Sequence, residues 1–241
     1  MTVAVAIPAE KFETGKQAET VKCIIADDHP LLRDALASLV SSGISGASVS
    51  VAENVASLHE LIEREGEPDI LLLDLHMPGA SGFSALSWFA GKYPEKPVIM
   101  ISANTLPDTV RCAIDHGAAA FLSKSADSSL IVDTVKRVLD GERELHPGLE
   151  IGTRGASLQA MDVAEALATL TPQQFRVTSM LAEGLLNKQI AYELDVKEAT
   201  IKAHMTEIFR KLGVHSRTQA VLALGNLSVS PSDEQQKVID E

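Results

Sequence analysis

Charged and polar residues stand at the ends of several apolar runs in the first half of this chain. Asp27 and Asp28 follow one run, Asp74 follows another, Ser102 ends a third, and Lys124 lies two residues beyond a fourth. Carboxylates brought together in this number would repel one another unless a divalent cation lay among them, and hard oxygen ligands suit Mg²⁺. A hydroxyl and an ammonium beside them could hold an incoming phosphoryl group. The residue types therefore predict phosphoryl transfer to a carboxylate.

The apolar runs are the expected strands of an α/β, doubly wound, five-stranded parallel sheet. From residue 21 onwards they alternate with longer segments of helical period, which is typical of a sheet covered by helices. The second run alternates in polarity and is expected nearer an edge. The carboxyl ends of such strands form the ligand site, so the polar residues should converge there. The expected strands are Lys22–Ala26, Ser48–Ala52, Ile70–Leu73, Val98–Ser102 and Ala118–Leu122, and the helical patterns lie at 31–40, 54–64, 82–91, 107–117 and 131–139.

Four segments, IIADDHP, LLLDLHMPGASG, ISAN and FLSK, resemble the signature segments of the response-regulator receiver family, whose fold is flavodoxin-like. The resemblance implies that Asp74 is the phosphoacceptor. It also implies that Asp27, Asp28 and Asp74 bind Mg²⁺ together with the backbone carbonyl of His76. An aspartate after a strand can instead cap the next helix. Capping does not, however, account for Lys124.

The same resemblance assigns roles around the phosphoacceptor. Ser102 and Lys124 would bind the phosphoryl group, with Ser102 as the switch hydroxyl. Phe121 would be the aromatic residue whose rotation reports the state of that hydroxyl. His76 and Asn104 occupy positions that tune the lifetime of the acyl phosphate. A lone aromatic residue at a strand end is equally compatible with simple packing, so both interpretations of Phe121 remain open.

Residues 170–225 have a helical pattern throughout. Thr171 is expected to cap the first helix and Asn187 the second. Two short helices joined by a tight turn, the second bearing exposed basic residues, suit insertion into the major groove of DNA. The expected helices open at Pro172 and close at Gly184, run from Asn187 to Leu194, and run from about Glu198 to Leu212.

Residues 170–221 resemble the LuxR-type helix-turn-helix, and next to a receiver they are typical of the NarL/FixJ subfamily. The resemblance implies a small all-α four-helix domain and an inactive receiver that masks the recognition helix. The fourth helix, near Arg217–Leu224, is a candidate dimer contact. Lys197 departs from the family pattern, because it replaces the serine or threonine that usually caps the recognition helix. The implied contacts are to phosphates by Lys188, Thr200 and Lys211, and to base edges by Lys202, Ala203 and Thr206.

The charge distribution separates the two halves. The whole chain has a net charge of −12, and residues 21–142 carry nine basic against 17 acidic residues. Residues 168–222 carry seven against five and are net +2, so this segment alone suits a polyanion. The expected organisation is a disordered N-terminal tail (1–20), a receiver domain (21–141), a linker (142–167), a helix-turn-helix domain (168–226) and a disordered C-terminal tail (227–241).

These features predict a response regulator that a sensor histidine kinase phosphorylates on Asp74, and that then binds double-stranded DNA as a homodimer to regulate transcription. It is not expected to be an enzyme, because a phosphatase of the haloacid dehalogenase type needs a second aspartate where this chain has His76. The alternative is a phosphorylation-independent DNA- or protein-binding regulator with a vestigial receiver. Two sparse cysteines and no long uncharged run predict a cytoplasmic protein with no membrane partner.

Overall fold

The structure is a computed structural model that describes residues 20–80, 82–152 and 166–225. The predicted tails fall almost entirely outside the described residues, as do positions 153–165 of the predicted linker. Among the helices in the described ranges, none has both the length and the apolar character needed to cross a membrane.

Residues 21–123 contain a five-stranded parallel sheet in the order β2-β1-β3-β4-β5. This confirms the predicted doubly wound fold and the edge position of the second strand. The last strand starts two residues later than expected. The strands are β1 (Val21–Ala26), β2 (Ala47–Ala52), β3 (Ile70–Asp74), β4 (Val98–Ser102) and β5 (Ala120–Ser123).

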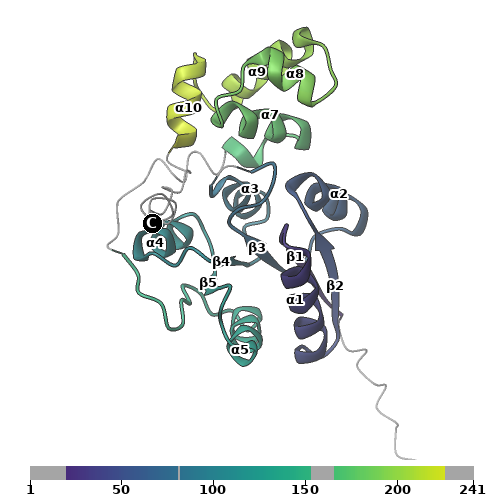
Figure 1. The fold of residues 1–241 in the computed structure, drawn as a ribbon, viewed down its shortest axis with the longest axis vertical. Helices are drawn as coiled ribbons and strands as arrows, with labels where there is room; N and C mark the ends of the chain where they lie inside the picture. The colour runs from purple at the N-terminus through teal and green to yellow at the C-terminus, as the bar shows by residue number, and fades with distance from the viewer. Residues whose placement is uncertain (1–19, 81, 153–165, 226–241) are drawn as a thin grey trace, which may run out of the picture.

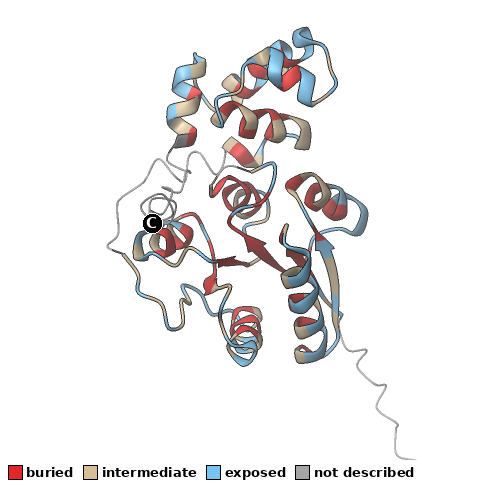
Figure 2. Cartoon of the chain, viewed as in Figure 1, coloured by how far each residue is buried: buried red, intermediate tan, exposed pale blue. Residues whose placement is uncertain are grey.

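Five helices cover the two faces of the sheet (Figure 1). Helices α1 (Pro30–Gly43) and α5 (Ser128–Leu139) pack on one face, over a buried cluster that includes Val40 and Val135. The opposite face carries α2 (Val55–Glu65), α3 (Ser84–Lys92) and α4 (Pro107–Asp115). With apolar side chains on both faces, the middle strands are buried throughout, and only their ends are available for a site (Figure 2).

The C-terminal helices form a second layer of structure above α2 and α3 (Figure 1). Thr171 caps the first of them, accepting a hydrogen bond from the backbone N–H of Gln174 at 3.3 Å, as expected. The prediction that Asn187 caps the second helix is wrong. Asn187 is already the first helical residue, and the Gln189 side chain accepts from the Leu186 N–H at 2.7 Å instead. The helices are α7 (Pro172–Ala182), α8 (Asn187–Glu193), α9 (Glu198–Lys211) and α10 (Arg217–Gly225).

The start of the predicted linker extends the sheet by one residue. Leu145 forms a parallel bridge with Ala120, donating from its N–H to the Ala119 carbonyl at 3.1 Å and accepting from the Phe121 N–H at 2.8 Å. Further along, the Gly152 N–H donates to the Pro107 carbonyl at the start of α4, at 2.8 Å. This stretch has no strand pattern, so the bridge was not predicted.

Helix α7 packs directly against the receiver. Its Phe175 is fully buried beside His59 of α2 and Trp88 of α3. The apolar cluster on the α2–α3 face of the sheet therefore continues without a break into the core of the helical domain. The two domains share one buried interface in this structure.

Candidate functional site

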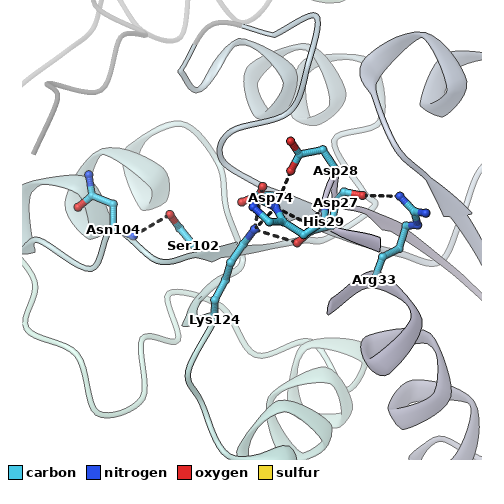
Figure 3. A network of polar contacts seen from close by, with 8 residues as sticks. All are labelled: Asp27, Asp28, His29, Arg33, Asp74, Ser102, Asn104 and Lys124. Atoms are coloured by element: carbon cyan, nitrogen blue, oxygen red, sulfur yellow. Dashed lines mark hydrogen bonds and ion pairs between the residues drawn. The ribbon is translucent and has the colours of Figure 1, made fainter. Parts of the chain in front are cut away.

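The carboxyl ends of neighbouring strands bring the predicted acidic residues together (Figure 3). Asp27 and Asp28 directly follow β1, and Asp74 is the last residue of β3, the strand paired with β1. Lys124 follows β5, and its backbone N–H donates to the Ser102 carbonyl at the end of β4, at 2.9 Å. The sheet topology thus brings three carboxylates and an ammonium to one point.

Lys124 joins the two buried aspartates. Its Nζ lies 2.9 Å from Oδ2 of Asp74 and 3.1 Å from Oδ2 of Asp27. These carboxylates are only 3% and 1% exposed, so their charges need a partner of opposite sign. Asp28 is more exposed, and its Oδ1 lies 2.6 Å from Nδ1 of His29.

The environment shifts the pKa values of Asp74 and Lys124. Burial raises the pKa of Asp74, and the Asp27 charge adds to the rise, while Lys124 opposes it. Burial alone would lower the pKa of Lys124, but contacts with the Asp74 and Asp27 carboxylates outweigh burial and raise it. The lysine is therefore cationic. The charged form of Asp74 is destabilised by its surroundings, and an added cation would stabilise it.

The acidic cluster has the chemistry of a divalent metal site. One ligand atom from each of Asp27, Asp28, His29 and Asp74 can be chosen so that all four lie within 4.8 Å of one another. Oδ1 of Asp74 is buried and, unlike Oδ2, has no ion-pair partner among the described residues. Oxygen donors in this number fit Mg²⁺.

His29 is a member of this cluster that the sequence did not single out. Besides Asp28, its Nδ1 lies 3.2 Å from Oδ1 of Asp27 and 3.3 Å from Nζ of Lys124. The only sequence signal is its position directly after the aspartate pair. The imidazole of His76, in contrast, is exposed and lies outside the cluster, as expected if only its carbonyl has a role.

Among the described residues, no hydrogen bond joins the side chain of Ser102 or Phe121 to the acidic cluster. The buried Oγ of Ser102 accepts a hydrogen bond from the Asn104 N–H at 3.1 Å. Asn104 in turn accepts from Thr109 Oγ1 on α4 at 3.3 Å. Phe121 is fully buried. The Ser102 hydroxyl is therefore linked through Asn104 to α4, and its switch role stays a prediction.

The second candidate site is the exposed face of α9. Lys202, Ala203 and Thr206 are all exposed, so the receiver does not mask the predicted base-reading residues. This overturns the expected masking for the described conformation. Lys202 forms an i,i+4 ion pair with Glu198 at 3.0 Å. An exposed pair of this kind is weak and easily exchanged for a nucleic-acid contact.

The three predicted phosphate contacts differ in their surroundings. Lys188 and Thr200 are exposed. Lys211 instead donates to the Thr169 carbonyl at 2.6 Å and to Oε1 of Gln174 at 2.7 Å, which fixes the end of α9 to the start of α7. A phosphate contact by Lys211 would require it to give up these bonds.

Comparison with known proteins finds matches to both halves of the chain. Residues 23–136 match the model of the response regulator receiver domain, and residues 168–224 match that of bacterial regulatory proteins of the luxR family. The glycerol metabolism activator of Pseudomonas putida is 37% identical over 86% of this chain and 96% of its own. The chain is a response regulator of the NarL/FixJ family.

Two further matches also cover most of the chain. The nitrate/nitrite response regulator NarL of Escherichia coli is 30% identical over 85% of this chain and 94% of its own. A structure of RcsB dimers bound to DNA has the same fold, with a TM-score of 0.50 at 20% identity, covering 87% of this chain and all of that one. The receiver and the LuxR-type domain together make this response regulator a DNA-binding regulator of transcription.

The acidic cluster leads to a prediction about stability without metal. We expect Asp74→Asn to raise the free energy of unfolding in chelator by on the order of 1 kcal/mol, because it removes a buried charge while Lys124 keeps Asp27 as its partner. Urea unfolding at neutral pH measures this. Saturating Mg²⁺ should stabilise the native chain more than the variant. Equal or lower stability of Asp74→Asn in chelator would show that the carboxylates do not repel one another.

The start of α9 leads to a second prediction. Lys197 is the N-cap residue of α9 and makes no side-chain cap hydrogen bond, and its charge lies at the positive end of the helix dipole. Lys197→Ser should therefore stabilise the free protein by about 1 kcal/mol in urea unfolding. Lys197→Ala is the matched control, because it removes the charge without adding a cap. If serine gains nothing over alanine, the end of α9 does not lack a cap.

Proposed function

We propose that a sensor histidine kinase phosphorylates this chain on Asp74, and that the phosphorylated form binds double-stranded DNA as a homodimer. The observation that carries the proposal is the convergence of Asp27, Asp28, Asp74 and Lys124 at one edge of the sheet. Such a protein works in the cytoplasm, where both the kinase domain and the DNA are found.

Phosphorylation requires an ionised nucleophile and a means to stabilise the added charge. A carboxylate oxygen of Asp74 forms a bond to phosphorus as the phosphorus–nitrogen bond of a phosphohistidine breaks, and the departing imidazole takes up a proton. Lys124, 2.9 Å from Asp74, favours the carboxylate and then pairs with the phosphoryl oxygens. Asp27, Asp28, Asp74 and the His76 carbonyl would hold Mg²⁺, which neutralises charge on those oxygens when bound.

Phosphorylation of Asp74 would affect the neighbouring helix α4 through Ser102. A bond from its hydroxyl to a phosphoryl oxygen would bear on the hydrogen bond that the hydroxyl accepts from Asn104, whose side chain contacts the start of α4. Rotation of Phe121 would accompany that change. A new charge that biases two arrangements of this segment is a switch of the usual kind.

DNA binding is assigned to α8 and α9. Exposed Lys202, Ala203 and Thr206 would read base edges, and Lys188, Thr200 and Lys211 would contact phosphates, the last after release from α7. A two-fold dimer presents both recognition helices to one face of the duplex, so half-sites should be about 10 bp apart. We retain 21–141, 142–167 and 168–226 as the bounds of the receiver, the linker and the DNA-binding domain.

A regulator with a vestigial receiver is the second candidate function. The acidic cluster and Lys124 argue against it, because they lie within ion-pair distance of one another. An aspartyl-phosphate phosphatase is disfavoured by the exposed His76 at the position where that class needs a second acid.

Phosphorylation is tested with acetyl phosphate and Mg²⁺. The native chain should incorporate phosphate that is labile to base, and Asp74→Asn should incorporate none, because it lacks the nucleophile and keeps the shape. Mass spectrometry of the intact protein measures both. Asp34→Asn, on the exposed face of α1, is the control and should behave as the native chain. No incorporation by the native chain would favour the vestigial receiver, and incorporation by Asp74→Asn at the native rate would show that the site is elsewhere.

DNA binding is tested by comparing two lysines. Lys202→Ala should cost about 1–3 kcal/mol on the preferred site and relax its sequence preference, as the loss of a base contact does. Lys188→Ala should weaken binding to all duplexes alike, and should lower the slope of log affinity against log salt concentration by about one. Titrations on specific and random duplexes at several salt concentrations separate the two effects.

The control for these titrations is Lys136→Ala, an exposed lysine of α5 on the receiver, which should change neither affinity nor specificity. If Lys202→Ala weakens specific and random duplexes equally, then α9 does not read bases through this residue.

A further inference from the structure

Three aromatic rings from three helices form the centre of the contact between the two domains. The ring of His59 on α2 lies 4.0 Å from that of Trp88 on α3 and 5.5 Å from that of Phe175 on α7, measured between centroids. Trp88 and Phe175 are 6.0 Å apart. His59 is 3% exposed and the other two rings are buried more completely. Because Phe175 lies on α7, in the DNA-binding domain, separating the domains removes one of the three rings from this cluster.

The imidazole of His59 is buried without a hydrogen bond. Neither Nδ1 nor Nε2 has a partner among the described residues, and the same is true of the nearby Trp88 Nε1 and of Ser179 Oγ on α7. Buried polar groups without partners favour whichever arrangement lets water reach them. A neutral His59 ring can therefore be buried in the docked arrangement. An imidazolium there would be strongly unfavourable, because it would bring two unpartnered N–H donors and a charge into an apolar contact.

The charged groups around His59 provide no anion to pair with an imidazolium. On α3, Nζ of Lys92 lies 5.2 Å from the centroid of the Trp88 ring and repels added positive charge. On α7 the neighbouring charged residue is the cation Arg176. The three acids on α2 itself, Glu60, Glu63 and Glu65, are exposed and form no ion pair with His59 in the described part of the chain.

We propose that His59 is a pH-sensitive latch between the receiver and the DNA-binding domain, which keeps them docked while its imidazole is neutral and releases them when it is protonated. The latch acts on domain separation itself and does not depend on phosphorylation of Asp74.

The direction of the effect follows from the two states of the ring. In the docked state burial, followed by repulsion from Lys92, lowers the pKa of His59 from 6.5 to about 4. In separated domains the ring regains water, and its pKa returns towards the ordinary value. The docked form binds the proton less tightly, so docking is strongest above about pH 6.5 and weakens as the pH falls towards 4. From pH 7.0 to 5.5 the equilibrium should shift towards separation by roughly eightfold.

Trp88 is the only tryptophan of the chain and reports directly on this contact. In the full-length protein, acrylamide quenching of its fluorescence should increase from pH 7.0 to 5.5, together with the radius of gyration from X-ray scattering. In His59→Gln and His59→Phe, which cannot take up the proton, both quantities should stay constant over the same interval. Far-UV circular dichroism checks that every variant is folded. If one of the two His59 variants does not fold, the other is sufficient for the test.

Two further variants make the test specific. His215→Gln removes an exposed histidine of the DNA-binding domain, outside the contact, and should retain the native pH response. Phe175→Ala removes the ring that covers His59 and should leave Trp88 open to quenching at both pH values. The latch is disproved if the native chain shows no change between pH 7.0 and 5.5. It is equally disproved if the His59 variants show the same change as the native chain.

Discussion

The ammonium of Lys124 holds together the carboxyl edge of the receiver sheet. Asp27 and Asp74 are both buried at the ends of adjacent strands, and Lys124 bonds to each of them from the far side of β4. Its backbone N–H also bonds to the end of β4. A lysine that reaches three strand ends aligns them, and the same charge permits two acids to lie side by side in a region of low polarity. The capacity for phosphoryl transfer and the local order of this edge thus rest on one residue.

Much of the fold and of the acidic cluster could be predicted from the sequence, because both depend on short-range patterns. Continuous apolar runs identify buried strands, and polar residues at their ends must converge once the strands are parallel. His29 was missed because its role depends on the direction in which its ring points. Lys211 was placed on DNA because the resemblance to LuxR-type domains implies a phosphate contact there, whereas its bonds to Thr169 and Gln174 join residues far apart in the chain.

The surfaces through which the two domains dock could not be predicted. His59 belongs to an amphipathic helix, and Phe175 to the first helix of an independent motif, so nothing in their local sequence indicates that they meet. The contact involves α7 and leaves the base-reading side of α9 exposed. In this conformation the receiver therefore restrains the position of the DNA-binding domain and does not cover its recognition surface. Such a restraint would control DNA binding if it kept the DNA-binding domains of two chains from reaching adjacent half-sites at the same time.

The bridge at Leu145 has a consequence for association between chains. Sheets with free edge strands can recruit strands from other molecules, because their outward N–H and C=O groups are unpaired. At β5 the outward groups of Ala119 and Phe121 are already bonded to Leu145. Within the described residues, the other border of the sheet is β2, where Val51 is exposed between serine and alanine. The segment that leads to the DNA-binding domain thus occupies part of the β5 edge, whereas β2 has no such neighbour among the described residues and is the more open border for strand addition.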